Sequence, residues 1–106
     1  MHYRMNPITP GEILFEDYMK PLGLSQNRLG RELGVAPRAI NEIVHGKRSI
    51  TAEMSIRLGA FFNQSPRFWL NIQTECDLRK ALQKKATLIR TIQPLKAVAE
   101  SSGKYG

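Results

Sequence analysis

Hydrophobic residues recur at helical spacing along most of this chain, and short polar stretches with glycine or proline separate the repeats. The first repeat starts at Thr9, where a hydroxyl cap is followed by Pro10 and by Glu12, the arrangement of a capping box. Its apolar stripe consists of Ile13, Leu14, Tyr18 and Met19. Pro21 and Gly23 then predict the end of this first helix.

The stretch from residue 25 to residue 46 predicts two short helices joined by a tight turn. Ser25 stands where a helix start needs a capping hydroxyl, and Gly34 stands where the chain leaving that helix needs a positive φ. Pro37 suits the first turn of the second helix. This second helix has an apolar face of Ile40, Ile43 and Val44 and a polar face of Arg38, Asn41, Glu42 and His45. The pattern is typical of a helix-turn-helix unit, whose second helix lies in the DNA major groove.

Side chains on the polar face have the donors and acceptors that read DNA bases. Arg38 can offer two donors to guanine O6 and N7, and Asn41 can pair with adenine N6 and N7. Other polar residues flank the unit, where they are placed to hold phosphate oxygens and to position the domain without reading sequence. These candidate phosphate contacts are Gln26, Asn27, Lys47 and Arg48.

A plain helical bundle would show much of the same pattern, because an Arg and an Asn on an exposed helix face are usually only solvated. Two glycines favour the DNA-binding interpretation. Gly34 suits the turn, and Gly30 lies inside the first helix of the pair, where a close helix crossing needs a minimal side chain.

Two further helices are predicted after residue 50. Thr51 caps the first, which ends around Asn63, and Ser65 with Pro66 starts the second. The apolar positions of the first are Met54, Leu58, Phe61 and Phe62; those of the second are Phe68, Trp69, Leu70, Ile72 and Cys76. We expect the aromatic group of the second helix to be core rather than a ligand pocket.

Composition limits the range of possible functions. The chain has 106 residues and is 42% hydrophobic and 24% charged, which is ordinary for one globular domain. It has no apolar run long enough to cross a bilayer, and its N-terminus lacks the apolar core of a signal peptide, so we expect a cytoplasmic protein. The single Cys76 favours neither a disulfide nor a zinc site, and no base or nucleophile set argues for an enzyme or a cofactor.

The net charge of +7 is unevenly distributed. Residues 1–78 carry nine Lys and Arg against eight Asp and Glu, whereas residues 79–106 carry seven against one. Residues 25–50 carry five basic residues against two acidic ones. A basic surface can therefore face a polyanion although the domain as a whole is close to neutral.

From Leu78 the chain continues as a basic segment with an apolar stripe at Leu78, Leu82, Ala86 and Ile89. It predicts a helix to about Thr91, interrupted by Pro94. With no core left to cover, the stripe favours self-association or docking of a partner protein. The alternatives are a frayed, solvated helix with a disordered end at residues 101–106, and a cationic tail that itself wraps an acidic partner or RNA.

Residues 9–78 resemble a known family, the HigA or VapI type of antitoxin within the Xre (Cro/C1-type) helix-turn-helix proteins. The matching stretches are TPGEIL, LGLSQNRLGRELGV, INEIVHGKRSIT and RLGAFFNQSPRFWLNIQTECDLR. The run SPRFWLNIQ is the most family-specific of them. Two positions depart from the family pattern: Gly30 stands where alanine is usual, and Pro37 stands where many relatives carry a polar reader. Residues 79–106 lie outside the resemblance.

The resemblance implies a five-helix Cro/C1 (lambda repressor-like) domain with a C-terminal helical extension. It implies a homodimer that represses its own promoter at an inverted-repeat operator in double-stranded DNA and neutralises a HigB-type toxin, an mRNA endonuclease. A stand-alone Xre-type regulator without a toxin is the alternative. The implied base-facing residues are Ala36, Pro37, Arg38, Asn41 and Glu42, and the implied phosphate-facing residues are Gln26, Asn27, Lys47 and Arg48.

Overall fold

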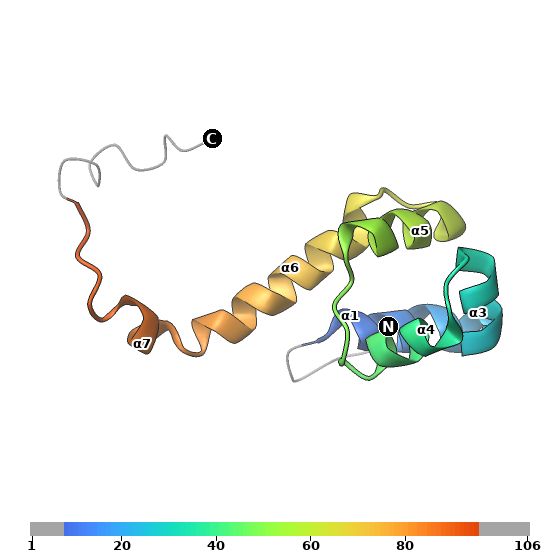
Figure 1. The fold of residues 1–106 in the computed structure, drawn as a ribbon, viewed down its shortest axis with the longest axis horizontal. Coiled ribbons are helices and arrows are strands. Elements are labelled where there is room, and N and C mark those ends of the chain that lie inside the picture. Colours follow the sequence, from blue (N-terminus) through green and yellow to red (C-terminus); the bar gives the residue numbers. More distant parts are fainter. Residues whose placement is uncertain (1–7, 96–106) are drawn as a thin grey trace.

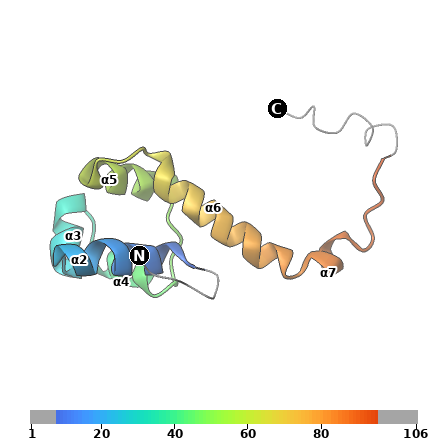
Figure 2. The same cartoon turned by 180° about the vertical axis from the view of Figure 1, so that it is seen from behind.

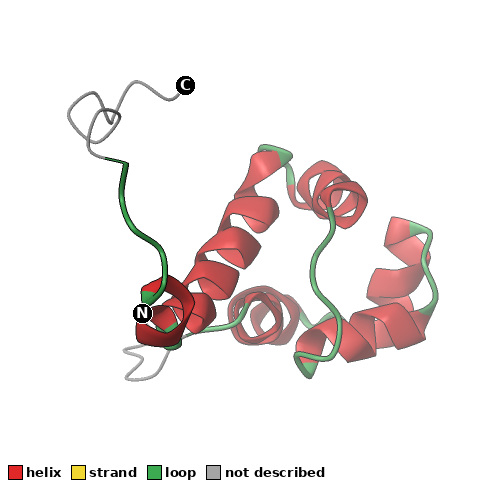
Figure 3. Cartoon of the chain, turned by 60° about the vertical axis from the view of Figure 1, so that its left-hand side comes forward, coloured by secondary structure: helices red, strands yellow, loops and turns green. Residues whose placement is uncertain are grey.

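The computed structural model describes residues 8–95, and every regular element in this range is helical (Figures 1 and 3). The elements are α1 (Pro10–Ile13), η1 (Leu14–Met19), α2 (Lys20–Leu22), α3 (Gln26–Leu33), α4 (Pro37–Val44), α5 (Ala52–Phe62), α6 (Arg67–Leu82) and α7 (Lys85–Ile89). The first three follow one another without a break and form one rod. Within the described range the domain therefore has the five helices predicted, and α7 follows them.

The first rod begins with the predicted capping box. The hydroxyl of Thr9 accepts from the backbone N–H of Glu12 at 3.1 Å, and the Glu12 carboxylate accepts from the N–H of Thr9 at 3.0 Å. The middle of the rod is a π-helix, so the N–H of Lys20 reaches the carbonyl of Phe15, five residues back. The rod passes through Pro21 and ends only at Gly23, which has a φ of 65°. Gly23 alone therefore ends the helix that Pro21 and Gly23 were expected to end together.

The pair α3 and α4 has the predicted tight turn. The Ser25 hydroxyl caps α3 by accepting from the N–H of Arg28 at 3.0 Å, and Gly34 closes α3 with a φ of 73°. A Cβ atom on Gly30 would lie 2.8 Å from the carbonyl oxygen of Val35 and 3.2 Å from Cα of Pro37. The close crossing predicted for Gly30 is therefore present, since no larger side chain fits between the two backbones without movement.

The core forms where this pair meets the first rod, α5 and α6. Its buried members are Leu14, Met19, Leu24, Leu29, Leu33, Ile40, Ile43, Ile50, Met54, Leu58 and Trp69. Trp69 is fully buried; its indole N–H donates to Gln64 at 2.8 Å, and Tyr18 packs on it with ring centroids 5.0 Å apart. Cys76, one of the predicted apolar positions of this helix, is also buried. Phe68 differs, because its side chain lies at the surface with 37% of the residue exposed.

One buried bond joins α6 to the loop after α4. The Gln73 side chain accepts from the backbone N–H of Ile50 at 2.8 Å and donates to Asp77 at 2.9 Å. Among the described residues, Gln73 is one of two buried polar residues, and the other, Ser55, donates to the carbonyl of Pro66 and accepts from the N–H of Leu70. Both satisfy backbone groups that burial would otherwise leave unpaired.

Beyond the core, α6 carries the chain away from the other helices, as both views show (Figures 1 and 2). The predicted continuous helix to Thr91 is wrong, because α6 ends at Leu82 and the short α7 follows after Gln83 and Lys84. All described side chains of residues 77–95 are exposed, so no packing holds this part of the helix together. Its large exposed apolar residues are Leu78, Leu82, Leu88, Ile89, Ile92 and Leu95. The tail end expected to be disordered, residues 101–106, lies outside the described residues.

No helix in the described part of the chain is long and apolar enough to cross a membrane.

The contact between α1 and the end of α4 gives a stability prediction. A Cβ atom on Gly11 would overlap the carbonyl oxygen of Ile43 and lie 2.9 Å from that of Val44. We expect Gly11→Ala to lower the free energy of unfolding by about 1–3 kcal/mol, because two backbones must separate. Denaturant unfolding measures this loss. Gly30→Ala serves as the comparison and should cost less, since its nearest backbone contact is longer. Equal stability of Gly11→Ala and the parent chain would contradict the close approach.

Candidate nucleic-acid interface

Helix α4 divides into a buried face and an exposed face. Ile40 and Ile43 are almost fully buried against the core, and they fix the rotation of the helix about its axis. Arg38 therefore points outward, with 85% of its side chain exposed, while Asn41 and Glu42 are half-buried on the same outer side. This division matches the two faces that the sequence pattern predicts.

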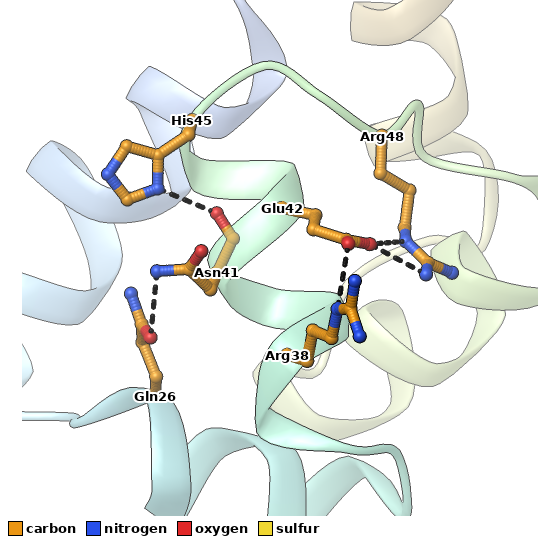
Figure 4. Close-up of polar contacts among 6 residues, drawn as sticks. All are labelled: Gln26, Arg38, Asn41, Glu42, His45 and Arg48. Atoms are coloured by element: carbon orange, nitrogen blue, oxygen red, sulfur yellow. Dashed lines mark hydrogen bonds and ion pairs between the residues drawn. The ribbon is translucent and has the colours of Figure 1, made fainter.

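Glu42 lies between two arginines on this outer side (Figure 4). One carboxylate oxygen accepts from Nε of Arg38 at 3.1 Å, one helical turn away. The other accepts from Nε and Nη2 of Arg48, at 2.8 Å and 2.7 Å. The sequence spacing suggests the pair with Arg38, but the pair with Arg48 depends on the fold of the loop after α4.

That loop is set by the way α4 ends. Gly46 has a φ of 74°, its N–H donates to the carbonyl of Ile43, and the N–H of Lys47 donates to the carbonyl of Glu42 at 2.8 Å. This left-handed ending turns the chain back beside the helix. Lys47 and Arg48 are consequently exposed next to the outer side of α4, where the sequence places candidate phosphate contacts.

The two arginines lower the pKa of the Glu42 carboxyl group. Hydrogen bonds from Arg48 have the largest effect and those from Arg38 the next largest, and each outweighs the opposing effect of burial. Glu42 is therefore a carboxylate at neutral pH, and each guanidinium next to it is held by a charge-assisted hydrogen bond.

A second contact joins α4 to α3. The Asn41 side-chain amide donates to the Gln26 carbonyl oxygen at 3.2 Å (Figure 4). A carboxamide has two donor hydrogens and an acceptor oxygen, so Asn41 retains one donor and the acceptor for a base edge. On the same turn, Nδ1 of His45 lies 2.8 Å from the backbone carbonyl oxygen of Asn41. Sequence spacing gives no sign of the Gln26 contact, because 15 positions separate the two residues.

The other predicted residues lie around the start of the two helices. Ala36 is the N-cap residue of α4 and Pro37 its first residue, and both are exposed. Asn27 is exposed in the first turn of α3. All nine sequence-predicted residues are thus exposed or half-buried on the helix pair and on the loop that follows it.

Arg57 also supports the helix pair, although the sequence pattern gives no sign of this role. This α5 residue donates through Nη1 to the carbonyl of Leu33 at 2.7 Å and pairs with Glu53 at 2.9 Å. It therefore supplies a donor to a carbonyl at the C-terminal end of α3. A hollow of about 400 Å³ between α4 and the start of α5 is bordered by Arg38, Arg48 and Arg57.

Among the described residues, no group of three His, Cys, Asp or Glu side chains is placed to hold a metal ion. The side chains at this surface carry amides, guanidinium groups, an ammonium group, an imidazole and a carboxylate, which suits a polyanion with hydrogen-bonding base edges.

Two short helices joined at a left-handed glycine, with the second exposing planar hydrogen-bonding side chains, define a helix-turn-helix protein. Comparison with known proteins agrees: the family model described as helix-turn-helix matches residues 15–69. Virulence-associated protein I of Dichelobacter nodosus is 46% identical to the chain over 97 residues, which are 92% of this chain and 89% of that protein.

Solved structures narrow the relationship. The structure described as Pseudomonas aeruginosa antitoxin HigA with higBA promoter is 38% identical with a TM-score of 0.80, covering 85% of this chain and 99% of that one. Antitoxin GraA in complex with its operator is 41% identical with a TM-score of 0.79, covering 90% and 97%. The chain belongs to the Xre-type helix-turn-helix family, among the HigA antitoxins. The Xre-type helix-turn-helix family is not a class of enzymes.

The paired arginines give a titration prediction. We expect the pKa of Glu42, followed by NMR of its side-chain carboxyl carbon, to lie below the ordinary range and to rise in Arg48→Ala. Arg38→Ala should raise it less, because Arg48 has the larger effect. Since the folded-state pKa is the lowered one, the ion pairs stabilise the fold above the ordinary pKa of the carboxyl, and this contribution disappears as the pH falls through the lowered value. An unchanged pKa in Arg48→Ala would contradict the pairing.

Proposed function

We propose that this chain is a sequence-specific DNA-binding repressor and the antitoxin of a HigBA-type toxin-antitoxin system. The observation that carries the proposal is the outer side of α4, where Arg38 and Asn41 stand one turn apart on a helix whose rotation is fixed by the core. Relatives with this fold have been solved with the higBA promoter and with operator DNA, which supports the same kind of binding here.

In this proposal α4 lies in the major groove, which is about 12 Å wide and admits one helix. Arg38 donates to guanine O6 and N7, and Asn41 pairs with adenine N6 and N7. Ala36 and Pro37 bring the start of α4 close to the bases, and Pro37 adds no polar reader of its own. Glu42 faces the bases from the same side of the helix.

The phosphate backbone is held from both ends of the helix pair. Gln26 and Asn27 lie in the first turn of α3, where backbone N–H groups also point outward. Lys47 and Arg48 follow α4 in the loop set by Gly46. These contacts position the domain on DNA and carry no sequence information.

The proposed assembly is a homodimer on an inverted repeat. Two copies of α4 then enter successive turns of the groove, about 34 Å apart, and doubling a small interface gives useful affinity. We assign DNA binding to residues 9–78 and treat residues 79–106 as a basic helical extension. Its exposed apolar residues, such as Leu82 and Leu88, are available for self-association or for a partner protein.

The proposed toxin partner is a HigB-type mRNA endonuclease, and the protein acts in the cytoplasm, where it meets both operator DNA and toxin. Relatives named as antitoxins support this part of the proposal, including antitoxin HigA-1 of Vibrio cholerae. We propose no catalytic role for the chain itself. The second candidate is a stand-alone Xre-type regulator, because relatives are also named as transcriptional regulators.

Substitution at Arg38 and at Lys47 should have different effects on DNA binding. The probe is a pool of duplexes with a randomised core, from which the bound fraction is selected and sequenced. Arg38→Ala should lower the preference at one base pair of each half-site by about 1–3 kcal/mol, because a bidentate contact is lost. Lys47→Ala should weaken binding to all sequences alike. The negative slope of log K against log salt should become less steep by about one.

The two variants serve as controls for each other, since both remove one positive charge. If Arg38→Ala bound selected and random duplexes with the ratio of the parent chain, the assignment of Arg38 as a base reader would be wrong.

Deleting residues 93–106 separates a DNA-reading domain from a tail-driven binder. We expect the shortened chain to keep its sequence preference, because the proposed base contacts all lie within α4 and its N-cap. Its overall affinity for DNA should fall only by the electrostatic contribution of the two removed lysines, Lys96 and Lys104. Quantitative binding of selected and random duplexes measures both quantities. Loss of the preference on truncation would favour the alternative in which the cationic tail binds the partner.

A further inference from the structure

Glu42 has an unusual position for a residue that faces DNA. It is an acidic side chain on the outer side of the proposed reading helix, where a carboxylate repels phosphate. A carboxylate can read cytosine by accepting from N4, and its two oxygens together have about four acceptor sites. On Glu42 three of these sites already face arginine nitrogens, one on Oε2 from Arg38 and two on Oε1 from Arg48. Reading a base would therefore leave Glu42 only the remaining site on the oxygen that Arg38 approaches.

The geometry of the two pairs suggests a different role. Arg38 uses only its Nε toward Glu42, so the two terminal nitrogens remain at the outer end of its planar guanidinium group. These are the donors that a guanine edge requires. Arg48 uses Nε and Nη2 and keeps Nη1 for a further acceptor. One carboxylate therefore holds a proposed base contact and a proposed phosphate contact in fixed relation.

We propose that Glu42 is a positioning residue, which aims the guanidinium group of Arg38 at a guanine and that of Arg48 at a phosphate and reads no base itself. The inference rests on the proposed function, because it assigns a role within the DNA-binding surface. An arginine that is 85% exposed would otherwise sample many rotamers, and ordering it before binding lowers the entropy lost in the complex. The carboxylate also lowers the attraction to DNA in general, and this cost is the same for selected and random duplexes.

The test compares Glu42→Ala and Glu42→Gln with the parent chain, using duplexes selected by the parent chain from a randomised pool and unselected duplexes from the same pool. Both variants lose the charge, so both should bind unselected duplexes about two- to fivefold more tightly. Glu42→Ala loses both acceptors, and its ratio of selected to unselected affinity should fall about fivefold or more. Glu42→Gln keeps one acceptor oxygen, so its ratio of selected to unselected affinity should lie between that of the parent chain and that of Glu42→Ala.

Arg38→Ala supplies the background that separates positioning from reading. If Glu42 acts on base readout through Arg38, adding Glu42→Ala to Arg38→Ala should leave the selected base preferences as they are in Arg38→Ala. A further loss of preference at another base pair in the double variant would overturn the inference and make Glu42 a base reader. Glu16→Ala is the matched control, because Glu16 also pairs with a cation four residues away, Lys20, but lies outside the helix pair.

NMR of the free protein tests the positioning directly. The Nε–H signals of Arg38 and Arg48 should be protected from solvent exchange in the parent chain, and both should lose this protection in Glu42→Ala. Protection that is unchanged in Glu42→Ala would overturn the inference, whatever the DNA-binding results. A parent chain that selects no sequence from the pool would instead show that the proposed function is wrong, and the two failures are therefore distinguishable.

Discussion

The burial of one face of α4 is the constraint on which the rest of the surface depends. Ile40 and Ile43 are held in the core, and Gly30 lets α3 approach the turn that leads into α4. With the axis and the rotation of α4 both fixed, the side chains on its other face have only one direction in which to point. A helix packed by fewer buried residues would present the same side chains in several orientations and would read DNA poorly.

Ion pairs and hydrogen bonds then orient the individual side chains on the exposed face of α4. The carboxylate of Glu42 draws together an arginine from the helix and one from the following loop, and Gln26 of α3 holds the amide of Asn41. Each of these contacts spans two elements or two turns. These contacts hold the side chains together in the absence of a ligand, which suits the role in reading base edges that we propose for α4.

Sequence reasoning predicted the features that follow from short-range rules. The cap residues Thr9, Ser25 and Thr51, the left-handed Gly34 and the two faces of α4 are all where the local pattern places them. Each depends on a few neighbouring residues, so the sequence contains the necessary information.

The features that were missed depend on contacts between distant segments. The second partner of Glu42 requires the path of the loop after Gly46, and the bond between Gln26 and Asn41 requires the crossing of two helices. Phe68 follows the helical period of the core but lies at the edge of the packed region, so the pattern overestimated its burial. The C-terminal stripe predicts one continuous helix to about Thr91, but without a packing partner α6 ends at Leu82 and the short α7 follows after Gln83 and Lys84.

The bond from Arg57 to the carbonyl of Leu33 has a consequence for protein engineering. The reading unit depends on α5 for a donor at the end of its first helix, so residues 25–46 are not a self-sufficient module. Grafted alone onto another scaffold, the unit would leave that carbonyl to solvent and lose the brace that fixes the end of α3. A transplant that keeps this brace must therefore carry the chain at least as far as Arg57.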